Sequence, residues 1–246
     1  MEKVIAVVSG KGGVGKTLMA TNLGVYLAEK GESVVIVDLN LQARGADLAL
    51  GLASRVVYDL ADALSGVCRL RQAAVKSKRF PGLAVIEPPL MKEHVNISPL
   101  EIQVLCEKLS QEYRHVILDM APGAGEAFEG IVSLARRALV VTTQDPISVR
   151  ACGRVIAAVE KRQVPESCLL INQVRLSLTD RGFLPAVEEI AQELRLPLCG
   201  VLPYDDHIHV AFTNGNPVIS RRDTPAGEHM EKILSCFMDP PESAGA

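Results

Sequence analysis

The residues of this chain that could do chemistry begin in a glycine-rich stretch near its start. Residues 9–17 read SGKGGVGKT and follow the apolar run VIAVV. Four of these residues fit the phosphate-binding pattern GxxxxGK[ST], namely Gly10, Gly15, Lys16 and Thr17. The pattern needs only one lysine, yet Lys11 stands five positions before Lys16. This second lysine therefore needs an explanation of its own.

The chemistry of such a loop follows from its residue types. Glycines let the backbone wrap closely around phosphate oxygens, because no Cβ stands in the way. The backbone N–H groups then form a concave nest at a helix N-terminus, where the helix dipole favours anions. Lys16 would neutralise the β- and γ-phosphates, and the Thr17 hydroxyl would ligate Mg²⁺, which prefers oxygen. The alternative is a glycine-rich turn with an incidental lysine. We expect the ligand contacts to come from Gly10, Lys11, Gly12, Gly13, Val14, Gly15, Lys16, Thr17 and Leu18.

Two aspartates are expected at the same site. Asp38 ends the run VVIVD, and Asp119 ends the run VILD. Ligands of an open parallel sheet bind at the carboxyl ends of its strands. Both carboxylates should therefore lie near the phosphates and hold Mg²⁺ or its waters. The alternative for each is an ordinary polar residue that ends a strand.

Apolar runs alternate with amphipathic stretches along the chain, and these elements must position the site. Several runs are almost continuously apolar, which is typical of strands covered on both faces of a parallel sheet. The expected strands are Lys3–Val8, Ser33–Leu39, Leu83–Glu87, His115–Asp119, Ala138–Thr143, Cys168–Asn172 and Leu198–Leu202. The expected helices are Lys16–Lys30, Val57–Leu64, Pro99–Glu112, Gly125–Ala135, Val149–Arg162, Gly182–Leu194, Asp205–Thr213 and Pro225–Met238. The pattern predicts an α/β fold, a doubly wound, mostly parallel sheet flanked by helices. We expect a single domain over residues 1–238 and a flexible tail over residues 239–246.

Composition narrows the class of protein. The chain has 246 residues, 48% of them apolar, which is enough for a sizeable core. Its net charge of −3 argues against a broad basic surface coated by nucleic acid. Its six cysteines form no CxxC pair, which indicates reduced thiols in a cytosolic protein. No apolar run approaches the roughly 20 residues that cross a bilayer, and no signal peptide is visible.

The stretch KGGVGKT, with its early lysine, resembles the deviant Walker A motif of the ParA/MinD ATPases, which are SIMIBI-type P-loop NTPases. The likeness covers most of the chain and is closer to the MinD-like branch than to the plasmid-partition branch. It includes TNLGVYLAEKGESVVIVDLN, RVVYDLADALSG, YRHVILDMAPG, ALVVTTQDPISVR and GVLPYD…NGNPVI. The resemblance implies ATP and Mg²⁺ as ligands, ATP hydrolysis, and a homodimer in the ATP state with two nucleotides at its interface.

The resemblance also implies roles for particular residues. Lys11 would reach the phosphates of the nucleotide held by the other subunit, whereas Lys16 would serve its own. Such a cation ties dimerisation to nucleotide state and stabilises charge during phosphoryl transfer. The alternative for Lys11 is a solvated charge. The adenine base would be held by residues after two late strands, with a plain turn as the alternative for the asparagine. These residues are Asn172, Pro203, Tyr204 and Asp205.

Three positions depart from the family pattern and concern hydrolysis. Where the family has an aspartate that positions the attacking water, this chain has Asn40. An amide can orient water but cannot take a proton, so we expect ATP binding to survive and hydrolysis to be slow. Leu18 replaces a small hydroxyl residue, and Ala151 replaces an aspartate in the segment that couples nucleotide state to the dimer interface.

The C-terminus departs as well. MinD-like proteins end in a basic amphipathic helix that lies in the membrane surface. Here Lys232 alone is basic, and prolines follow at once, so direct membrane binding is not supported. We expect the apolar face of Ile233, Leu234, Phe237 and Met238 to pack on the domain instead. The pair Arg221–Arg222 is a weak sign of DNA binding, and a solvated loop is the better explanation.

Three functions remain open from sequence. The first is a nucleotide-gated dimer that positions division, flagellar or other polar machinery through an unidentified regulatory partner, in the cytoplasm or peripherally at the membrane through that partner. The second is a scaffold or regulator locked by ATP that it hardly hydrolyses. The third is a DNA-associated partition ATPase.

Overall fold

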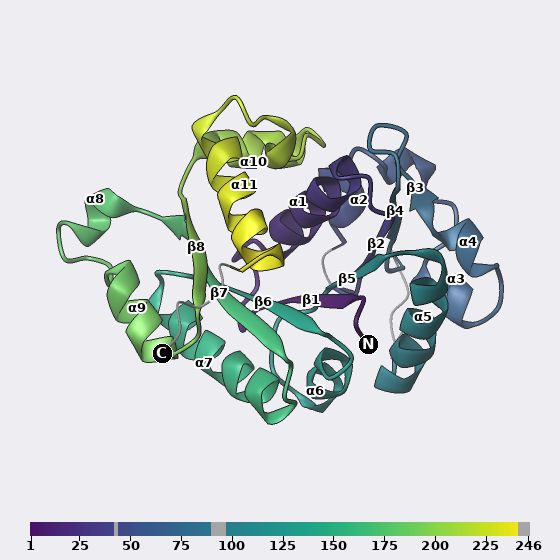
Figure 1. Ribbon diagram of the computed structural model, residues 1–246, viewed down its shortest axis with the longest axis horizontal. Coiled ribbons are helices and arrows are strands. Elements are labelled where there is room, and N and C mark those ends of the chain that lie inside the picture. Colours follow the sequence, from purple (N-terminus) through teal and green to yellow (C-terminus); the bar gives the residue numbers. More distant parts are fainter. Residues whose placement is uncertain (42–43, 90–96, 241–246) are drawn as a thin grey trace.

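A computed structural model describes residues 1–41, 44–89 and 97–240 of the chain, and these contain an eight-stranded sheet (Figure 1). The strands are β1 (Val4–Val8), β2 (Val34–Asp38), β3 (Val75–Lys76), β4 (Leu83–Ile86), β5 (His115–Asp119), β6 (Arg137–Thr143), β7 (Glu166–Val174) and β8 (Leu198–Pro203). They lie in the order β3-β4-β2-β5-β1-β6-β7-β8. Every neighbouring pair is parallel except β3 and β4. The predicted doubly wound α/β fold is confirmed.

The pleat of the strands distributes apolar side chains to both faces of the sheet. In β1, Val4, Ala6 and Val8 belong to one buried cluster, whereas Ile5 and Val7 belong to the other. Because successive side chains point to opposite faces, a strand buried on both sides must be apolar throughout. This is why VIAVV has no polar residue.

Helices cover each face of this sheet, as Figure 1 shows. One cluster is covered by α1 (Lys16–Glu29), α2 (Ala46–Ala49), α10 (Asp206–Thr213) and α11 (Pro225–Met238). The other is covered by α3 (Leu60–Leu64), α4 (Leu70–Ala73), α5 (Pro99–Glu112), α6 (Glu126–Val132), α7 (Pro146–Lys161) and α9 (Val187–Leu194). The remaining short elements are α8 (Leu176–Thr179) and the 3-10 turns Ala53–Arg55 and Val218–Ser220.

The strand order places the functional site. β1 lies between β5 and β6, so the chain leaves β1 at the point where the order of connections reverses. Ligands of doubly wound sheets bind outside the carboxyl ends of the strands at such a point. The phosphate loop follows β1 there, and Asp119 ends the neighbouring strand β5.

The expected strands agree with the structure to within two residues, whereas several helix starts were wrong. The helix expected from Gly182 begins at Val187, because residues before it form a loop tied to Gln144. The helix expected from Val57 begins at Leu60, where the Asp59 side chain caps it. The helix expected from Val149 begins earlier, at Pro146, because Asp145 caps it. The two-residue strand β3 and the one-turn helices α2, α4 and α8 were not predicted.

The last helix packs on the sheet, as predicted from its apolar face. Ile233, Leu234 and Phe237 are buried in α11, and Met238 is partly buried against the same cluster. Arg137 donates a hydrogen bond of 2.9 Å to the Phe237 carbonyl. No helix among the described residues has the length and apolar character of a membrane span. The division into a domain over residues 1–238 and a tail over 239–246 stays a prediction, and residues 241–246 lie outside the described residues.

Candidate functional site

The phosphate loop lies so close to two other elements that glycine is required at two positions. A Cβ on Gly10 would lie 2.3 Å from the backbone carbonyl of Ala151 in α7. A Cβ on Gly15 would lie 2.2 Å from Nδ2 of Asn172 in β7, and Gly15 has a left-handed φ of +103°. The loop is therefore held from behind by α7 and β7, with its backbone free to face a ligand.

Lys16 begins α1 and is 6% exposed. Its Nζ donates to Ser9 Oγ at 2.8 Å, and that hydroxyl in turn donates to the Lys11 carbonyl at 2.8 Å. Burial lowers the pKa of Lys16, while the charges of Asp119 and Asp38 raise it. A phosphate beside this ammonium would supply a counter-charge in a site from which water is largely excluded, so Lys16 is suited to the bound nucleotide.

Asp119 and Thr17 form the corner that fits Mg²⁺. Thr17 Oγ1 donates to Asp119 Oδ2 at 2.5 Å. The other oxygen, Oδ1, is buried and has no hydrogen-bond partner among the described residues. Burial, together with the charge of Asp38, raises the pKa of Asp119 to about 7. An orphaned carboxylate oxygen beside a hydroxyl suits a hard cation, whose charge would return the carboxyl to its ionised form.

Asp38 lies beside Asp119 because the two residues are in register on β2 and β5. Its oxygens accept the backbone N–H of Asn40 at 2.8 Å and of Gly45 at 3.2 Å. Asp38 thus shapes the loop that presents Asn40, and its metal role stays a prediction. The described residues contain no group of three or more His, Cys, Asp or Glu that could hold a metal alone. Phosphate oxygens and water would have to complete the coordination of Mg²⁺.

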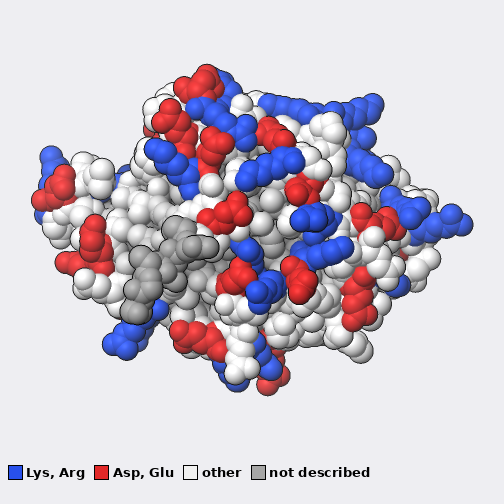
Figure 2. Space-filling model, in the orientation of Figure 1, with Lys and Arg blue, Asp and Glu red and all other residues white. Residues whose placement is uncertain are grey.

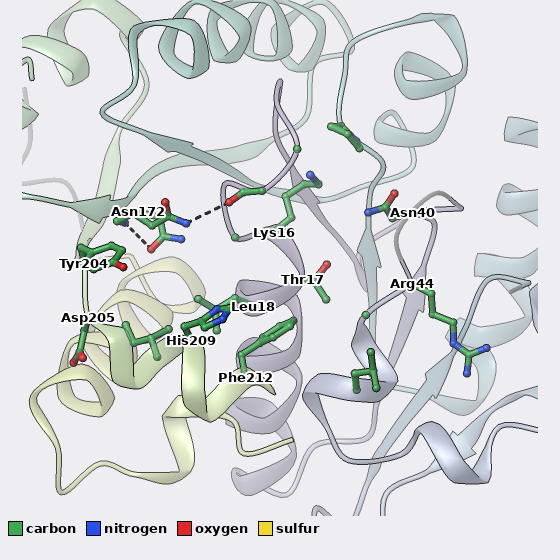
Figure 3. Close-up of a pocket in the computed structure, with 18 of the residues that line it drawn as sticks. Lys16, Thr17, Leu18, Asn40, Arg44, Asn172, Tyr204, Asp205, His209 and Phe212 are labelled. Carbon is green, nitrogen blue, oxygen red and sulfur yellow. Dashed lines mark hydrogen bonds between the residues drawn. The ribbon is translucent and has the colours of Figure 1, made fainter. Parts of the chain in front are cut away.

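A cavity of about 580 Å³ opens beside the phosphate loop (Figure 3). Eleven predicted site residues line it, namely Gly12, Gly13, Gly15, Lys16, Thr17, Leu18, Asn40, Asn172, Pro203, Tyr204 and Asp205. Five predicted residues do not line it, namely Gly10, Lys11, Val14, Asp38 and Asp119. Figure 3 shows Lys16, Thr17 and Asn40 at one end and Tyr204 and Asp205 at the other. The residues predicted to bind phosphate and those predicted to bind the base therefore lie at opposite ends of the cavity, called the phosphate end and the base end below.

At the base end, two predicted polar residues already have partners. Asn172 is 3% exposed, donates to the Val14 carbonyl at 2.8 Å and accepts from the Gln173 N–H at 2.8 Å. It braces the phosphate loop and keeps one donor and one acceptor position for a ligand. Asp205 accepts from the His207 N–H at 2.8 Å and caps α10. The ring of Tyr204 lies 3.8 Å from the Arg175 guanidinium.

Sequence reasoning missed several lining residues. The apolar wall of the base end includes Leu48 from α2 and the α10 residues Ile208, His209 and Phe212. The exposed side of the helix expected over Asp205–Thr213 carries apolar residues, and this was a usable signal. The sequence gives no signal for Gln173. In the structure it has a left-handed φ of +57°, and its Nε2 donates to the Gly13 carbonyl at 3.3 Å. Strain of this kind is retained where neighbouring structure fixes it, here against the phosphate loop.

A buried cluster of polar side chains behind the loop that carries Asn40 was also missed. Arg44 lines the cavity, and its Nε donates to Asp47 Oδ2 at 2.8 Å. The same nitrogen lies 3.4 Å from Glu87 Oε2. Glu87 is fully buried at the end of β4, and its carboxylate has no hydrogen-bond partner of good geometry among the described residues. The cluster fixes Arg44 between α2 and β4.

With this geometry in place, comparison with known proteins decides the family. The ParA family model, described as NUBPL iron-transfer P-loop NTPase, matches residues 1–238. The chain belongs to the ParA family of P-loop NTPases. The iron transfer named in that description refers to NUBPL. A nucleoside triphosphate with Mg²⁺ fits the phosphate and metal corners described above, as expected of a P-loop NTPase.

The relatives place the chain in the MinD-like branch of the ParA family. The septum site-determining protein MinD of Bacillus subtilis is 36% identical over 220 residues, 89% of this chain and 82% of that protein. MinD of a Synechocystis strain is 35% identical, with 89% and 82% covered. Among solved structures, the MinC:MinD cell division protein complex of Aquifex aeolicus matches with a TM-score of 0.87 and 28% identity, covering 99% of this chain and 98% of that one. MinD of Pyrococcus horikoshii with Mg-ADP shares the fold, with a TM-score of 0.84, 24% identity and coverage of 96% and 95%.

The second lysine of this ParA-family loop lies outside the cavity. Lys11 Nζ lies 2.5 Å from Asp145 Oδ2, and the two side chains are 45% and 37% exposed. The hydrogen bond from Lys11 lowers the pKa of Asp145, which also accepts from Ser148 Oγ at 3.0 Å at the start of α7. An ion pair this exposed is worth about 0–1 kcal/mol, so the lysine can leave it at little cost.

Two departures from the family pattern can now be located. Leu18 lines the cavity and is buried, so an apolar side chain stands where a hydroxyl would be free to contact a ligand. Ala151 lies in α7 with its carbonyl against Gly10, and it offers no charge to the loop. Asp145, six positions earlier in the chain, holds Lys11 instead.

Proposed function

We propose that this chain is a MinD-like ATPase of the cytosol that forms a homodimer when it binds ATP, hydrolyses ATP slowly, and takes part in positioning the division septum or another polar structure. The septum site-determining relatives support the cellular role. The similar Aquifex aeolicus structure is a complex of MinC with MinD, which supports a regulatory protein partner here.

The observation that carries the proposal is the division of labour between two lysines of one loop. Lys16 is buried at the wall of the cavity, where it would serve the nucleotide of its own chain. Lys11 is half exposed, lies outside that cavity, and is held by a weak ion pair with Asp145. A cation presented at the surface beside a phosphate site is available to a second nucleotide. In a face-to-face pair of molecules, Lys11 would therefore serve the nucleotide of the partner.

The roles of the chain's residues follow from their positions. Lys16 and the loop N–H groups would bind the phosphates, and Thr17 with Asp119 would hold Mg²⁺, which would supply positive charge to the phosphates. Asn40 faces the phosphate end and would orient a water molecule by hydrogen bonding. Because its amide cannot take a proton, the water lacks a general base, and hydrolysis is slow.

The two lysines give the decisive experiment. Lys16→Ala should abolish binding of a fluorescent ATP analogue, because the buried counter-charge is lost. Lys11→Ala should keep the nucleotide affinity of the monomer within about twofold but prevent the ATP-dependent dimer seen by light scattering during gel filtration. Equal loss of nucleotide in both variants would show that Lys11 acts in its own site.

A second candidate is favoured by Asn40, namely a scaffold locked as a dimer by ATP that it hardly hydrolyses. Single-turnover phosphate release, measured with and without liposomes, separates the two. The proposed ATPase releases phosphate from pre-formed dimers, whereas the scaffold retains ATP over the lifetime of the complex. The DNA-partition alternative loses support, because Arg221 pairs with Asp223 and Arg222 pairs with Glu29 and Glu231.

A further inference from the structure

We propose that residues 175–185, named the α8 lobe here, form a contact surface for a second copy of this chain, with Phe183 as its apolar anchor. The inference rests on the ATP-dependent dimer of the proposed function. It adds a docking surface that the phosphate-loop chemistry does not require.

The α8 lobe is held in a fixed conformation by one buried side chain. Gln144 is 1% exposed and follows β6 directly. Its Nε2 donates to Thr179 Oγ1 at 2.7 Å and to the Pro185 carbonyl at 2.9 Å, and its Oε1 accepts from the Arg175 N–H at 2.8 Å. Three hydrogen bonds from one amide fix the start, the middle and the end of the lobe. A surface fixed in this way loses little conformational entropy on docking.

This fixed lobe displays apolar side chains to solvent. Phe183 is 71% exposed and Leu176 is 64% exposed. Ile147, three residues after Gln144, is 69% exposed at the start of α7. Of the other four phenylalanines, Phe80, Phe128 and Phe237 are buried and Phe212 lines the nucleotide cavity. An exposed aromatic ring on a well-anchored loop is the type of side chain that anchors protein interfaces.

The charges around these apolar residues suit a copy of the same chain. Arg150, Asp180 and Arg181 are exposed, and none has an opposite charge within salt-bridge distance in the described part of the chain. Figure 2 shows red and blue side chains beside uncharged ones at the far left, where Figure 1 places α8. A two-fold symmetric contact pairs a surface with itself, so it needs both signs of charge on one patch. A polyanion would favour a patch of one sign.

The lobe is also continuous with the surface that presents Lys11. Gln144 and Asp145 are neighbours in sequence; the first binds the lobe and the second binds Lys11. On the other side, Gln173 connects the start of the lobe to the phosphate loop through the Gly13 carbonyl. A second molecule close enough for Lys11 to reach its nucleotide would therefore meet the lobe.

The test compares two exposed apolar residues at different places on the fold. Phe183→Ser should raise the dimer dissociation constant at least tenfold in a non-hydrolysable ATP analogue, measured by analytical ultracentrifugation. Its nucleotide affinity below the dimerisation concentration should stay within twofold of wild type. Leu100→Ser, which changes a residue 67% exposed on α5, is the matched control and should dimerise as wild type does.

Hydrogen exchange gives a second measurement that does not depend on a variant. Amides of residues 175–185 should exchange more slowly in the ATP analogue than in ADP, and Lys11→Ala should remove the difference. If the wild type dimerises and Phe183→Ser dimerises equally well, the α8 lobe is not the contact surface. If the wild type stays monomeric in the ATP analogue, the proposed function fails and this inference fails with it.

Discussion

Three carboxyl groups around the candidate site are buried, and burial changes their proton affinity more than any neighbouring charge does. It is the largest cause of the raised pKa of Asp38, Glu87 and Asp119. A bound cation would favour the ionised form of Asp119. Glu87 lies behind Arg44, away from the phosphates, and burial raises its pKa from 4.5 to about 9. Glu87 is therefore a neutral acid at pH 7.

Glu87→Gln should remove a pH dependence of stability. Folding raises the pKa of Glu87, so the folded state holds a proton that the unfolded state releases between pH 4.5 and about 9. The stability associated with this proton is complete below pH 4.5 and is lost as the pH rises toward 9. The neutral amide of glutamine has no proton to lose. The difference in unfolding free energy, variant minus wild type, should increase from pH 5 to pH 8 in urea titrations. Parallel pH profiles would contradict the raised pKa.

At the scale of elements, the phosphate loop depends on α7 and β7 as much as on its own glycines. Gly10 touches the α7 backbone and Gly15 touches Asn172 near the end of β7. Gly12, by contrast, has no atom within 4 Å of the position that a Cβ would occupy. Packing therefore accounts for Gly10 and Gly15 but not for Gly12, for which we propose the close approach of phosphate as the reason.

Gly10→Ala and Gly12→Ala should separate these reasons. A methyl group at Gly10 meets a helix carbonyl at 2.3 Å, and the backbone must move to accept it. Overpacking of this kind costs about 1–3 kcal/mol, or a decrease in Tm of roughly 5 °C for a chain of this size. Gly12→Ala should keep its Tm within about 1 °C in the absence of nucleotide. Differential scanning calorimetry checks both, and equal Tm values would show that the loop can separate from α7 freely.

The same elements show what the sequence could predict. The bounds of α5 and α11 were correct because Ser98 with Pro99, and Thr224 with Pro225, give explicit start signals. Seven parallel strands were recognisable because burial on both faces demands continuous apolar runs. The strand β3 has two residues, and α8 is a single turn fixed by a distant glutamine, so neither leaves a periodic pattern.

Some residues of the candidate site could be named from the sequence, and others could not. The residues of its phosphate end could be named from sequence because glycine spacing and strand-end aspartates have a direct chemical meaning, and their contacts with a ligand stay a prediction. The lining of its base end could be named only in part, because Leu48 and Phe212 are ordinary apolar residues until tertiary packing brings α2 and α10 together. The partner of Lys11 could not be predicted, since Asp145 is 134 residues away in the chain.

At the scale of the whole molecule, the features that we expect to respond to nucleotide all lie at the carboxyl-terminal end of the sheet or at the surface beside it. The phosphate loop, Asn40 and the base end lie around one cavity at the carboxyl ends of the strands, and Lys11 and the α8 lobe lie at the adjoining surface. A second molecule docked there would close over the nucleotide. Binding of ATP, folding stability and association are then linked equilibria.

This linkage predicts that thermal stability in ATP depends on protein concentration. Free nucleotide at about 100 times its dissociation constant stabilises each molecule by about 2.7 kcal/mol, whatever the protein concentration. Dimerisation adds a stabilising free energy that grows with protein concentration. Tm in a non-hydrolysable ATP analogue with Mg²⁺ should therefore rise across a hundredfold series of protein concentrations. Tm in ADP should stay constant. Lys11→Ala should keep the shift caused by nucleotide and lose the dependence on concentration, because its own site is intact but its contact with the partner is absent. A wild-type Tm that is the same at every concentration in the ATP analogue would mean that nucleotide is bound by single molecules, and Lys11 would then have no partner to reach.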